Sequence, residues 1–377
     1  SSLNNAGYVC PSHFVPLSSP GIISQGLKWM LNPVSPFYVK PRLNRDFLLW
    51  AWRFRQSCTD EHVRRVAPLL RDLHTRSLEL YKQFAALKAF DFEWTEKGLL
   101  IVYRTEHGRR LCKEEAKLSE KLGVEVTMLD ANGVQQMQPE VEMRTDGGLF
   151  YPGDCHLTPA KFVQGLVSLL QREGVRLMPH TAALGLKAEA NRIVGVETPK
   201  GLLKADEFVL AGGSWSPAIV RSLGIRLLVE AGKGYSVTVP RRERKPSVPF
   251  ICFEARVAVT PMGENLRLAG TMEIAGVDTS ITRRRVDAIL NAITQYMGSV
   301  QPSDFNGVEP WSGLRPVSPD GVPYIGRFKK YPNLIAATGH AMIGMSLAPV
   351  TGELVAEIVK NGKPEFDMAL VSPDRFE

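Results

Sequence analysis

The 377-residue chain has little cysteine, little histidine and no long apolar run, and each shortage excludes a class of protein. Its five cysteines are far apart and include no CxxC pair, so a zinc ribbon, a dithiol redox motif and a disulfide-stapled small domain are excluded. Its seven histidines include no HExxH pattern, and we therefore predict no metal site. No stretch approaches the roughly 18 apolar residues that a membrane-spanning helix requires.

Charge and composition are those of an ordinary globular protein. The 46 lysines and arginines exceed the 39 acidic residues, which gives a formal charge of +7 that is dispersed along the chain. Dispersed charge of this size is typical of solubility rather than of a nucleic-acid surface, so we predict no nucleic-acid partner. The cysteine usage favours a reducing compartment, and we expect a cytoplasmic protein. The length corresponds to about two domains.

Hydrophobic periodicity predicts both helices and strands, and therefore an α/β (α+β) protein. Steps of three and four residues, with capping signals, predict these helices: Val63–Phe90, Arg109–Leu122, Thr158–Glu173, Thr282–Met297 and Met345–Lys360. Short apolar runs predict these strands: Val175–His180, Phe208–Leu210, Leu227–Val239, Phe250–Thr260, Asn265–Thr271, Trp311–Pro316 and Asn333–Ala337. Ala183–Ala188 and Ile193–Glu197 are expected to form a hairpin.

Two apolar and aromatic segments near the start have two interpretations. Ile22–Met30 and Phe47–Phe54 are rich in apolar residues and carry Trp29, Trp50 and Trp52. They can be helix faces buried beneath a substrate domain. Alternatively, they can form an interfacial patch that contacts a membrane surface, since aromatic residues with nearby basic residues suit that environment.

Two predicted strands run directly into small-residue turns that precede helices. Phe208–Leu210 leads into Ala211, Gly212, Gly213 and Trp215. Asn333–Ala337 leads into the segment 338–344, which contains two glycines and one histidine. At such turns the backbone amides approach a ligand closely, and the following helix presents its free N–H groups.

Four segments together carry a resemblance to a known family. In chain order they are NNAGYVCPS from residue 4, KGYSVTVP from residue 233, WSGLRPVSPDGVPYIG from residue 311 and ATGHAMIGMSLAP from residue 337. They resemble the FAD-dependent D-amino acid oxidase superfamily, and within it the bacterial D-amino acid dehydrogenases. The resemblance extends from residue 1 to about residue 362. It implies an FAD/NAD(P)-binding Rossmann-like domain and an antiparallel-sheet substrate domain.

The resemblance also implies how the chain is divided and where it departs from the family. It assigns residues 1–12, 155–225 and 320–377 to the FAD-binding domain, and residues 13–154 and 226–319 to the substrate-binding domain. Members of the family begin with a βαβ unit whose GxGxxG turn binds the FAD pyrophosphate. No GxGxxG occurs here. We therefore expect that this first unit is missing, either from the molecule or only from this sequence.

The resemblance further assigns catalytic and cofactor-binding residues. The W-x-G-x-R-P setting makes Arg315 the residue that binds the substrate carboxylate, and a guanidinium suits a carboxylate because it forms two parallel hydrogen bonds. Tyr235 is expected to supply a second hydrogen bond to this carboxylate. His340 is expected to orient the flavin or to influence its reoxidation. Structural roles remain alternatives for all three residues.

The FAD contacts are expected to come from four short segments. Their residues are Asn4, Asn5, Ala6 and Gly7; Ala211, Gly212, Gly213 and Trp215; Gly313 and Arg315; and Gly339, His340, Ala341, Met342, Ile343 and Gly344. Some relatives attach FAD covalently through a cysteine near the segment that contains Arg315. Gly313 and Leu314 occupy that stretch here, so we predict non-covalent FAD.

The implied reaction is the oxidation of a D-amino acid or a cyclic imino acid of the D-proline or hydroxyproline type. A hydride passes from Cα to flavin N5, the imino acid becomes a 2-oxo acid, and a quinone or other acceptor takes the electrons. An oxidase of the glycine or sarcosine type that uses O₂ is one alternative. A flavin-free, truncated subunit without catalysis is another. A partner subunit and a peripheral position on the inner face of the membrane are further expectations.

Overall fold

The computed structural model describes residues 2–30, 35–240 and 244–377. Its α-helices are α1 (Ile22–Met30), α2 (Arg45–Ser57), α3 (Asp60–Ala86), α4 (Glu106–Lys121), α5 (Ala131–Met137), α6 (Pro159–Arg172), α7 (Ser216–Val220), α8 (Arg283–Tyr296) and α9 (Gly344–Val359). Short 3-10 turns are η1 (Ser2–Asn4), η2 (Gly213–Trp215), η3 (Arg221–Leu223) and η4 (Pro302–Phe305). Within the described residues no helix is both long and apolar enough to cross a membrane.

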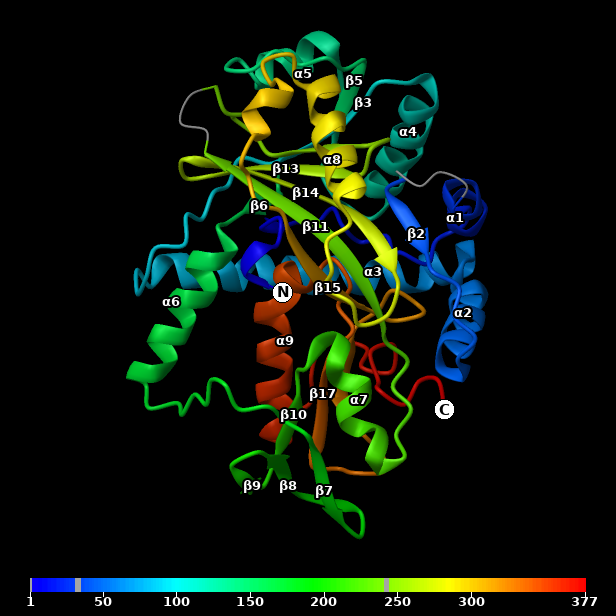
Figure 1. Ribbon diagram of the computed structural model, residues 1–377, viewed down its shortest axis with the longest axis vertical. Helices are drawn as coiled ribbons and strands as arrows, with labels where there is room; N and C mark the ends of the chain where they lie inside the picture. The colour runs from blue at the N-terminus through cyan, green and yellow to red at the C-terminus, as the bar shows by residue number, and fades with distance from the viewer. Residues whose placement is uncertain (1, 31–34, 241–243) are drawn as a thin grey trace.

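A large, mainly antiparallel sheet occupies one half of the molecule (Figure 1). In the described residues it has nine strands in the order β15-β11-β14-β13-β12-β3-β5-β4, with β2 beside β14. The strands are β2 (Phe37–Val39), β3 (Leu99–Tyr103), β4 (Thr127–Asp130), β5 (Gly147–Tyr151), β11 (Glu230–Pro240), β12 (Phe250–Cys252), β13 (Val257–Met262), β14 (Asn265–Ile274) and β15 (Trp311–Val317). All of them lie in the ranges 13–154 and 226–319.

Smaller sheets form the other half. The strands β10 (Phe208–Leu210), β17 (Leu334–Thr338) and β16 (Tyr324–Arg327) form one sheet, in which β10 and β17 are parallel. The strands β7 (Gly185–Glu189), β8 (Arg192–Thr198) and β9 (Gly201–Leu203) form another, and β1 (Tyr8–Val9) pairs with β6 (Cys155–His156). The division of strands between the two halves follows the domain ranges expected from the sequence, and those ranges stay a prediction.

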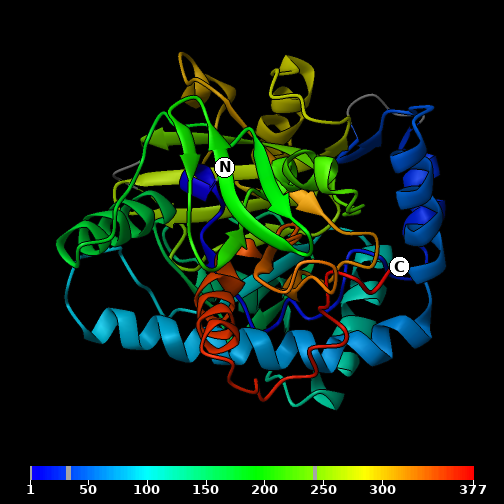
Figure 2. The same cartoon turned by 90° about the horizontal axis from the view of Figure 1, so that it is seen from below.

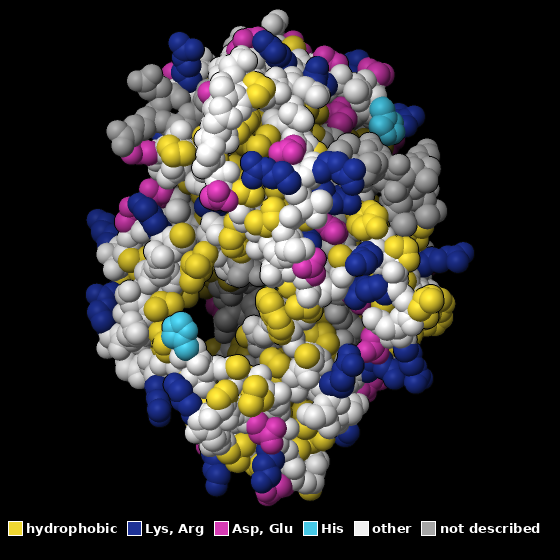
Figure 3. All heavy atoms as spheres, viewed as in Figure 1, with side chains coloured by type: hydrophobic (Ala, Val, Ile, Leu, Met, Phe, Trp, Pro, Cys, Tyr) yellow, Lys and Arg dark blue, Asp and Glu magenta, His cyan; other side chains and the backbone are white. Residues whose placement is uncertain are grey.

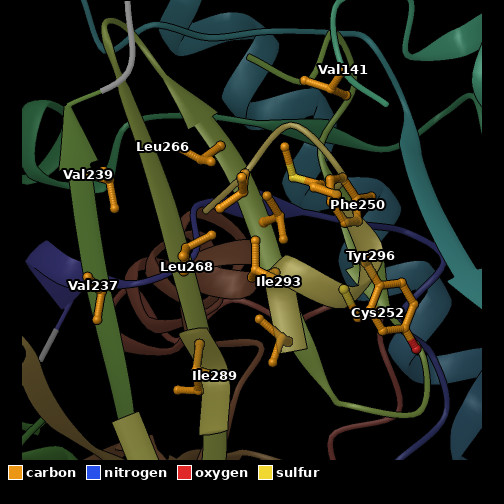
Figure 4. Close-up of a cluster of buried hydrophobic side chains, with 14 of the residues drawn as sticks. Val141, Val237, Val239, Phe250, Cys252, Leu266, Leu268, Ile289, Ile293 and Tyr296 are labelled. Carbon is orange, nitrogen blue, oxygen red and sulfur yellow. The ribbon is translucent and has the colours of Figure 1, made fainter. Parts of the chain in front are cut away.

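Helices cover the large sheet and connect the halves. Helix α8 packs on one face of the sheet, where Ile289 and Ile293 meet Val237 and Leu268 (Figure 4). Helix α3 runs across the width of the molecule, behind the region where the two halves meet, as the view from below shows (Figure 2). Its buried face packs against α9, with Leu70 among the buried side chains. Helix α3 therefore supports the α9 region, and its Arg71 donates to the Leu122 carbonyl at the end of α4.

The predicted helices occur within a few residues of their expected bounds, but two strand predictions are wrong. Val175–His180 forms no strand, because this segment is largely exposed and pairs with no other strand in the described chain. Phe250–Thr260 is not continuous: it divides into β12 and β13 around a turn at residues 253–256. The hairpin expected over 183–197 is confirmed as β7 and β8.

The aromatic segment at α2 divides its side chains between the interior and the surface. Phe47, Trp50 and Phe54 are buried, and the Trp50 indole N–H donates to the Val317 carbonyl at 2.9 Å. Trp52 and Leu48 lie outward and are 49% and 52% exposed. Trp29 lies in α1, but its side chain is outside the described ones. The buried interpretation holds for one face of α2, and contact of the other face with a membrane stays a prediction.

Candidate functional site

The parallel strands β10 and β17 place both predicted small-residue turns at one edge of their sheet. Because parallel strands end on the same side, residues 211–215 and 339–343 emerge together. Side chains join the two turns: the Thr338 hydroxyl donates to the Gly213 carbonyl at 3.2 Å, and the Ser216 hydroxyl donates to Thr338 Oγ1 at 3.3 Å. Trp215 is 46% exposed beside this junction. In an open α/β sheet this edge is where ligands bind.

The first turn of α9, which follows the second of these turns, is held in place by α3. The Tyr81 hydroxyl donates to the Met345 carbonyl and the Ser77 hydroxyl to the Ser346 carbonyl, both at 2.6 Å. His74 Nδ1 lies 2.7 Å from the Ser346 hydroxyl, which also accepts the Cys10 backbone N–H. The first N–H groups of a helix lack partners within the helix. Here the turn that carries these N–H groups is anchored by buried side chains of α3.

The turn before α9 also contacts the strand that carries Arg315. The Ala341 N–H donates to the Pro316 carbonyl at 2.8 Å, and Val317 forms an isolated bridge with His340. Gly339 has a φ of +81°, and a Cβ there would lie 2.7 Å from the Tyr324 ring, so only glycine fits. The structure therefore brings the end of β15, directly after Arg315, together with the 339–344 segment, and the cofactor and substrate roles of these residues stay predictions.

Arg315 lies half-buried on β15, and a strained residue positions it. Its Nη1 donates to the Thr271 carbonyl at 2.7 Å. Thr271 has a φ of +66° at the point where the β11–β14 register shifts, and a β-branched residue rarely adopts that conformation. Burial lowers the pKa of Arg315 to about 10, so the guanidinium stays charged at neutral pH. No ion pair includes Arg315 in the described part of the chain.

Two glycines make room for the side chains on this face of the sheet. Gly234 pairs with Gly313 across β11 and β15. A Cβ on Gly234 would lie 2.0 Å from Arg315 Nη1, so the guanidinium rests directly over this residue. A Cβ on Gly313 would lie 2.1 Å from the six-membered ring of Trp311, which covers Gly313 in the same way. The structure thus places Gly313 beneath the Trp311 indole and beside the guanidinium of Arg315.

Tyr235 lies on the other face of the sheet, and the structure does not bring it together with Arg315. Side chains alternate along a strand, and the β11–β15 register pairs Arg315 with Gly232, so Tyr235 faces the opposite way. Its ring is fully buried in the core beneath α8, and its hydroxyl donates to Glu273 at 3.0 Å. This geometry therefore supports a structural role for Tyr235 in the core of the sheet.

His340 is held as a neutral imidazole. Its Nε2 lies 2.9 Å from the Thr351 hydroxyl, whose own proton is donated to the Leu347 carbonyl at 2.8 Å. The imidazole therefore donates from Nε2. Burial lowers the pKa of His340 to about 4, which keeps the ring uncharged at neutral pH. This arrangement anchors the 339–344 turn to α9 and leaves Nδ1 as the acceptor atom of the ring.

The segment Asn4–Gly7 is tied to the large sheet. The Asn5 carbonyl accepts from Arg267 at 3.0 Å, and the Ala6 carbonyl accepts from the Thr260 hydroxyl at 2.8 Å. Gly7 has a φ of +81°, and a Cβ there would lie 2.2 Å from the Leu157 carbonyl oxygen. The segment is therefore fixed by its backbone, and its contact with a cofactor stays a prediction.

One group of potential metal ligands lies next to this segment. The ligand atoms of Cys10, His13 and Asp154 lie within 4.8 Å of one another. Asp154 is buried and accepts from the backbone N–H and the hydroxyl of Ser12, at 3.2 and 2.5 Å. Burial raises its pKa to about 7. These hydrogen bonds give Asp154 a structural role in holding the chain after β1, and the expectation of no metal site stays a prediction.

Comparisons with known proteins agree with this architecture. The sequence profile described as FAD dependent oxidoreductase matches residues 2–358. The chain belongs to the family of FAD-dependent oxidoreductases. It is 30% identical to the D-amino acid dehydrogenase of Cereibacter sphaeroides over its whole length, covering 86% of that protein. It is 32% identical to the D-amino acid dehydrogenase of Methylobacterium radiotolerans, with 98% of this chain and 90% of that protein covered.

Solved structures show the same fold. Glycine oxidase from Geobacillus kaustophilus is 24% identical with a TM-score of 0.75, over 82% of this chain and 84% of the other. L-proline dehydrogenase from P. horikoshii is 21% identical with a TM-score of 0.72, over 82% and 83%. The likeness to these two structures concerns the fold. It confirms the mixed α/β architecture expected for an FAD-dependent oxidoreductase.

The residues around α9 fit the flavin part of FAD. The turns at 211–215 and 339–344 carry small side chains, and a Cβ on Gly213 would meet nothing within 4 Å. Helix α9 presents free N–H groups, which suit the anionic edge of a reduced flavin. The pyrophosphate has no GxGxxG turn to receive it in the 377 residues. The N–H groups at the start of α9 therefore suit the flavin end of FAD, and not its pyrophosphate.

Three residues that shape the site were missed by the sequence analysis: Thr271, Ser346 and Trp311. Thr271 positions Arg315 by its carbonyl, and nothing in the sequence distinguishes a strand threonine with positive φ. Ser346 joins α9 to α3 and to Cys10, which depends on contacts between distant segments. Trp311 stands in the motif that identified Arg315, and its spacing of four residues could have placed both side chains on one face of a strand.

Proposed function

We propose that this protein oxidises a D-amino acid or a cyclic imino acid, with FAD bound non-covalently as the hydride acceptor. The observation that carries the proposal is the position of Arg315. A charged guanidinium without an acidic partner in the described chain extends from β15, and the next residue of that strand, Pro316, accepts the Ala341 N–H from the turn before α9. A cation placed in this way is suited to bind a carboxylate. The D-amino acid dehydrogenases named above support the choice of substrate class.

The reaction breaks the Cα–H bond and removes a hydride, which carries both electrons of the oxidation. A bound flavin supplies the acceptor for this hydride. The amine loses a proton, and a C=N bond forms between Cα and nitrogen. Water then converts the imine of a primary amine into a 2-oxo acid and ammonia, whereas a cyclic imine can remain closed. The electrons pass on to a quinone or another acceptor.

Binding the carboxylate, supporting the flavin and orienting the reacting groups can each be assigned to residues of this chain. Arg315 binds the carboxylate, and the Thr271 carbonyl fixes the position of the guanidinium. The first turn of α9 contributes its amide dipoles, and α3 keeps that turn in place. His340 stays neutral within the turn, so its role is to orient groups rather than to supply charge. A substrate amine that is already deprotonated needs no strong base.

The electron acceptor and the location belong to the same proposal. Trp52 and Leu48 form an exposed apolar pair on α2, with the Arg53 guanidinium 4.8 Å from the Trp52 ring centre. Apolar and cationic groups side by side suit a membrane surface that contains a quinone. We propose a cytoplasmic protein that reaches such a surface through this pair, alone or with a partner subunit.

The first test is the absorbance spectrum of the purified protein, followed by anaerobic addition of a D-amino acid panel that includes D-proline. We expect flavin bands that bleach with a substrate. Release of hydrogen peroxide in air at the turnover rate would instead identify an oxidase of the glycine or sarcosine type. A colourless protein that takes up no added FAD would overturn the proposal and favour the flavin-free subunit.

A further inference from the structure

The Trp311 indole lies on the same face of the large sheet as the carboxylate-binding Arg315. The residues are four positions apart in β15, so their side chains point to the same side. The indole covers Gly313, and the guanidinium covers Gly234. Since Gly234 and Gly313 are paired across the strands, the two side chains come together over neighbouring residues. In the space-filling view, the surface is hollowed near the centre of the molecule, between its two halves (Figure 3).

Apolar atoms lie on the other side of the guanidinium as well. Gly232 is the residue paired with Arg315, and a Cβ on it would lie 2.4 Å from the sulfur of Met272. Glu230 is the acidic residue that shares this face of β11, two positions before Gly232, and it forms an ion pair with Arg42. The acid Glu273 lies on the opposite face and accepts from Tyr235. A positively charged substrate side chain would thus meet no free carboxylate among these groups.

We propose that Trp311 selects the substrate, favouring amino acids whose side chain is compact and apolar, above all a ring closed onto the amine as in D-proline. The inference rests on the function proposed above. When the carboxylate is bound to Arg315, Cα is fixed one bond away, and only groups close to Cα lie beside the indole. A pyrrolidine ring meets this condition because its carbons join Cα and nitrogen directly. A long charged side chain extends beyond the indole.

The test compares kcat/KM for D-proline, D-alanine, D-arginine and D-glutamate in the wild type and in three variants. These are Trp311→Ala, Trp311→Phe and Gly313→Ala, with Gly153→Ala as the control because a Cβ there meets nothing within 4 Å. A soluble dye serves as the acceptor. In the same proteins, intrinsic fluorescence reports the binding of tetrahydro-2-furoate, a ring carboxylate that cannot be oxidised as an amine, against that of propionate.

We expect D-proline to exceed D-arginine and D-glutamate by at least tenfold in the wild type. In Trp311→Ala, kcat/KM for D-proline falls on the order of tenfold, the discrimination that a few apolar contacts supply, while D-alanine changes less than threefold. Gly313→Ala also lowers kcat/KM for D-proline because its Cβ displaces the indole. Trp311→Phe retains most of the activity, and the affinity for tetrahydro-2-furoate follows the same order.

Other results separate the two proposals. A wild type that prefers D-arginine or D-glutamate overturns the inference about Trp311, and so does an equal loss of all substrates in Trp311→Ala. Both outcomes leave the proposed oxidation intact. If no amino or imino acid is oxidised, the proposed function fails. The fluorescence titration then still decides whether Trp311 distinguishes a ring carboxylate from propionate.

Discussion

Gly234→Ala tests whether the position of the Arg315 guanidinium determines activity. The added Cβ would lie 2.0 Å from Nη1 and 2.4 Å from Cζ, whereas real Cβ contacts stay above 3.0 Å. The guanidinium must therefore move by about 1 Å, and a misplacement of that size costs on the order of 100-fold in rate, or about 2.7 kcal/mol. We expect kcat/KM for every carboxylate substrate to fall by this factor.

The fold should tolerate this substitution. The group that the new Cβ meets is the flexible end of an arginine, and alanine is the better strand residue, so the melting temperature and flavin content should match those of Gly153→Ala. Steady-state kinetics with a soluble dye, flavin absorbance and a thermal melt measure the three quantities. An unchanged kcat/KM in a fully loaded protein would refute the assignment of Arg315.

Further substitutions test other parts of the site. Arg315→Ala should raise KM strongly, since losing a buried charged hydrogen bond costs about 2–5 kcal/mol; a normal KM with normal flavin content would contradict carboxylate binding. Gly344→Val should abolish flavin retention by filling space at the start of α9, where a Cβ already approaches His340 to 3.3 Å; a yellow, loaded variant would refute this placement. Burial raises the pKa of Asp154 from 3.8 to about 7, so the folded protein loses the stabilising protonated form of this carboxyl as pH rises through that range. In denaturant titrations between pH 5 and 8, the free energy of unfolding of the wild type should therefore fall relative to that of Asp154→Asn. A difference in unfolding free energy that stays constant with pH would contradict this prediction.

The sequence predicted the elements whose signals are local. Helices α3, α6 and α9 were predicted because their apolar residues recur at helical spacing over several turns. The strand over 175–180 was wrong because an apolar run becomes a strand only where a neighbouring strand pairs with it. That neighbour is a property of the tertiary structure.

The candidate site was predictable in its members and not in its geometry. Arg315 and the 339–344 turn could be named from the sequence because motifs identify them, and in the structure the turn contacts Pro316 and Val317, which follow Arg315 on β15. Whether Tyr235 shares their face depends on the register of β11 against β15, which no local pattern specifies. The positive φ of Thr271 likewise arises from a register shift between two strands.

The parallel pair of β10 and β17 has a consequence for how the protein is made. Phe208 pairs with Leu334, and the whole of β11 to β16 is synthesised between them. A chain still emerging from the ribosome therefore lacks the edge at which residues 211–215 and 339–343 meet. Contacts so distant in sequence form slowly, because a long loop must close first. If FAD binds at this edge, as proposed, its loading comes after translation has passed β17 and the turn before α9.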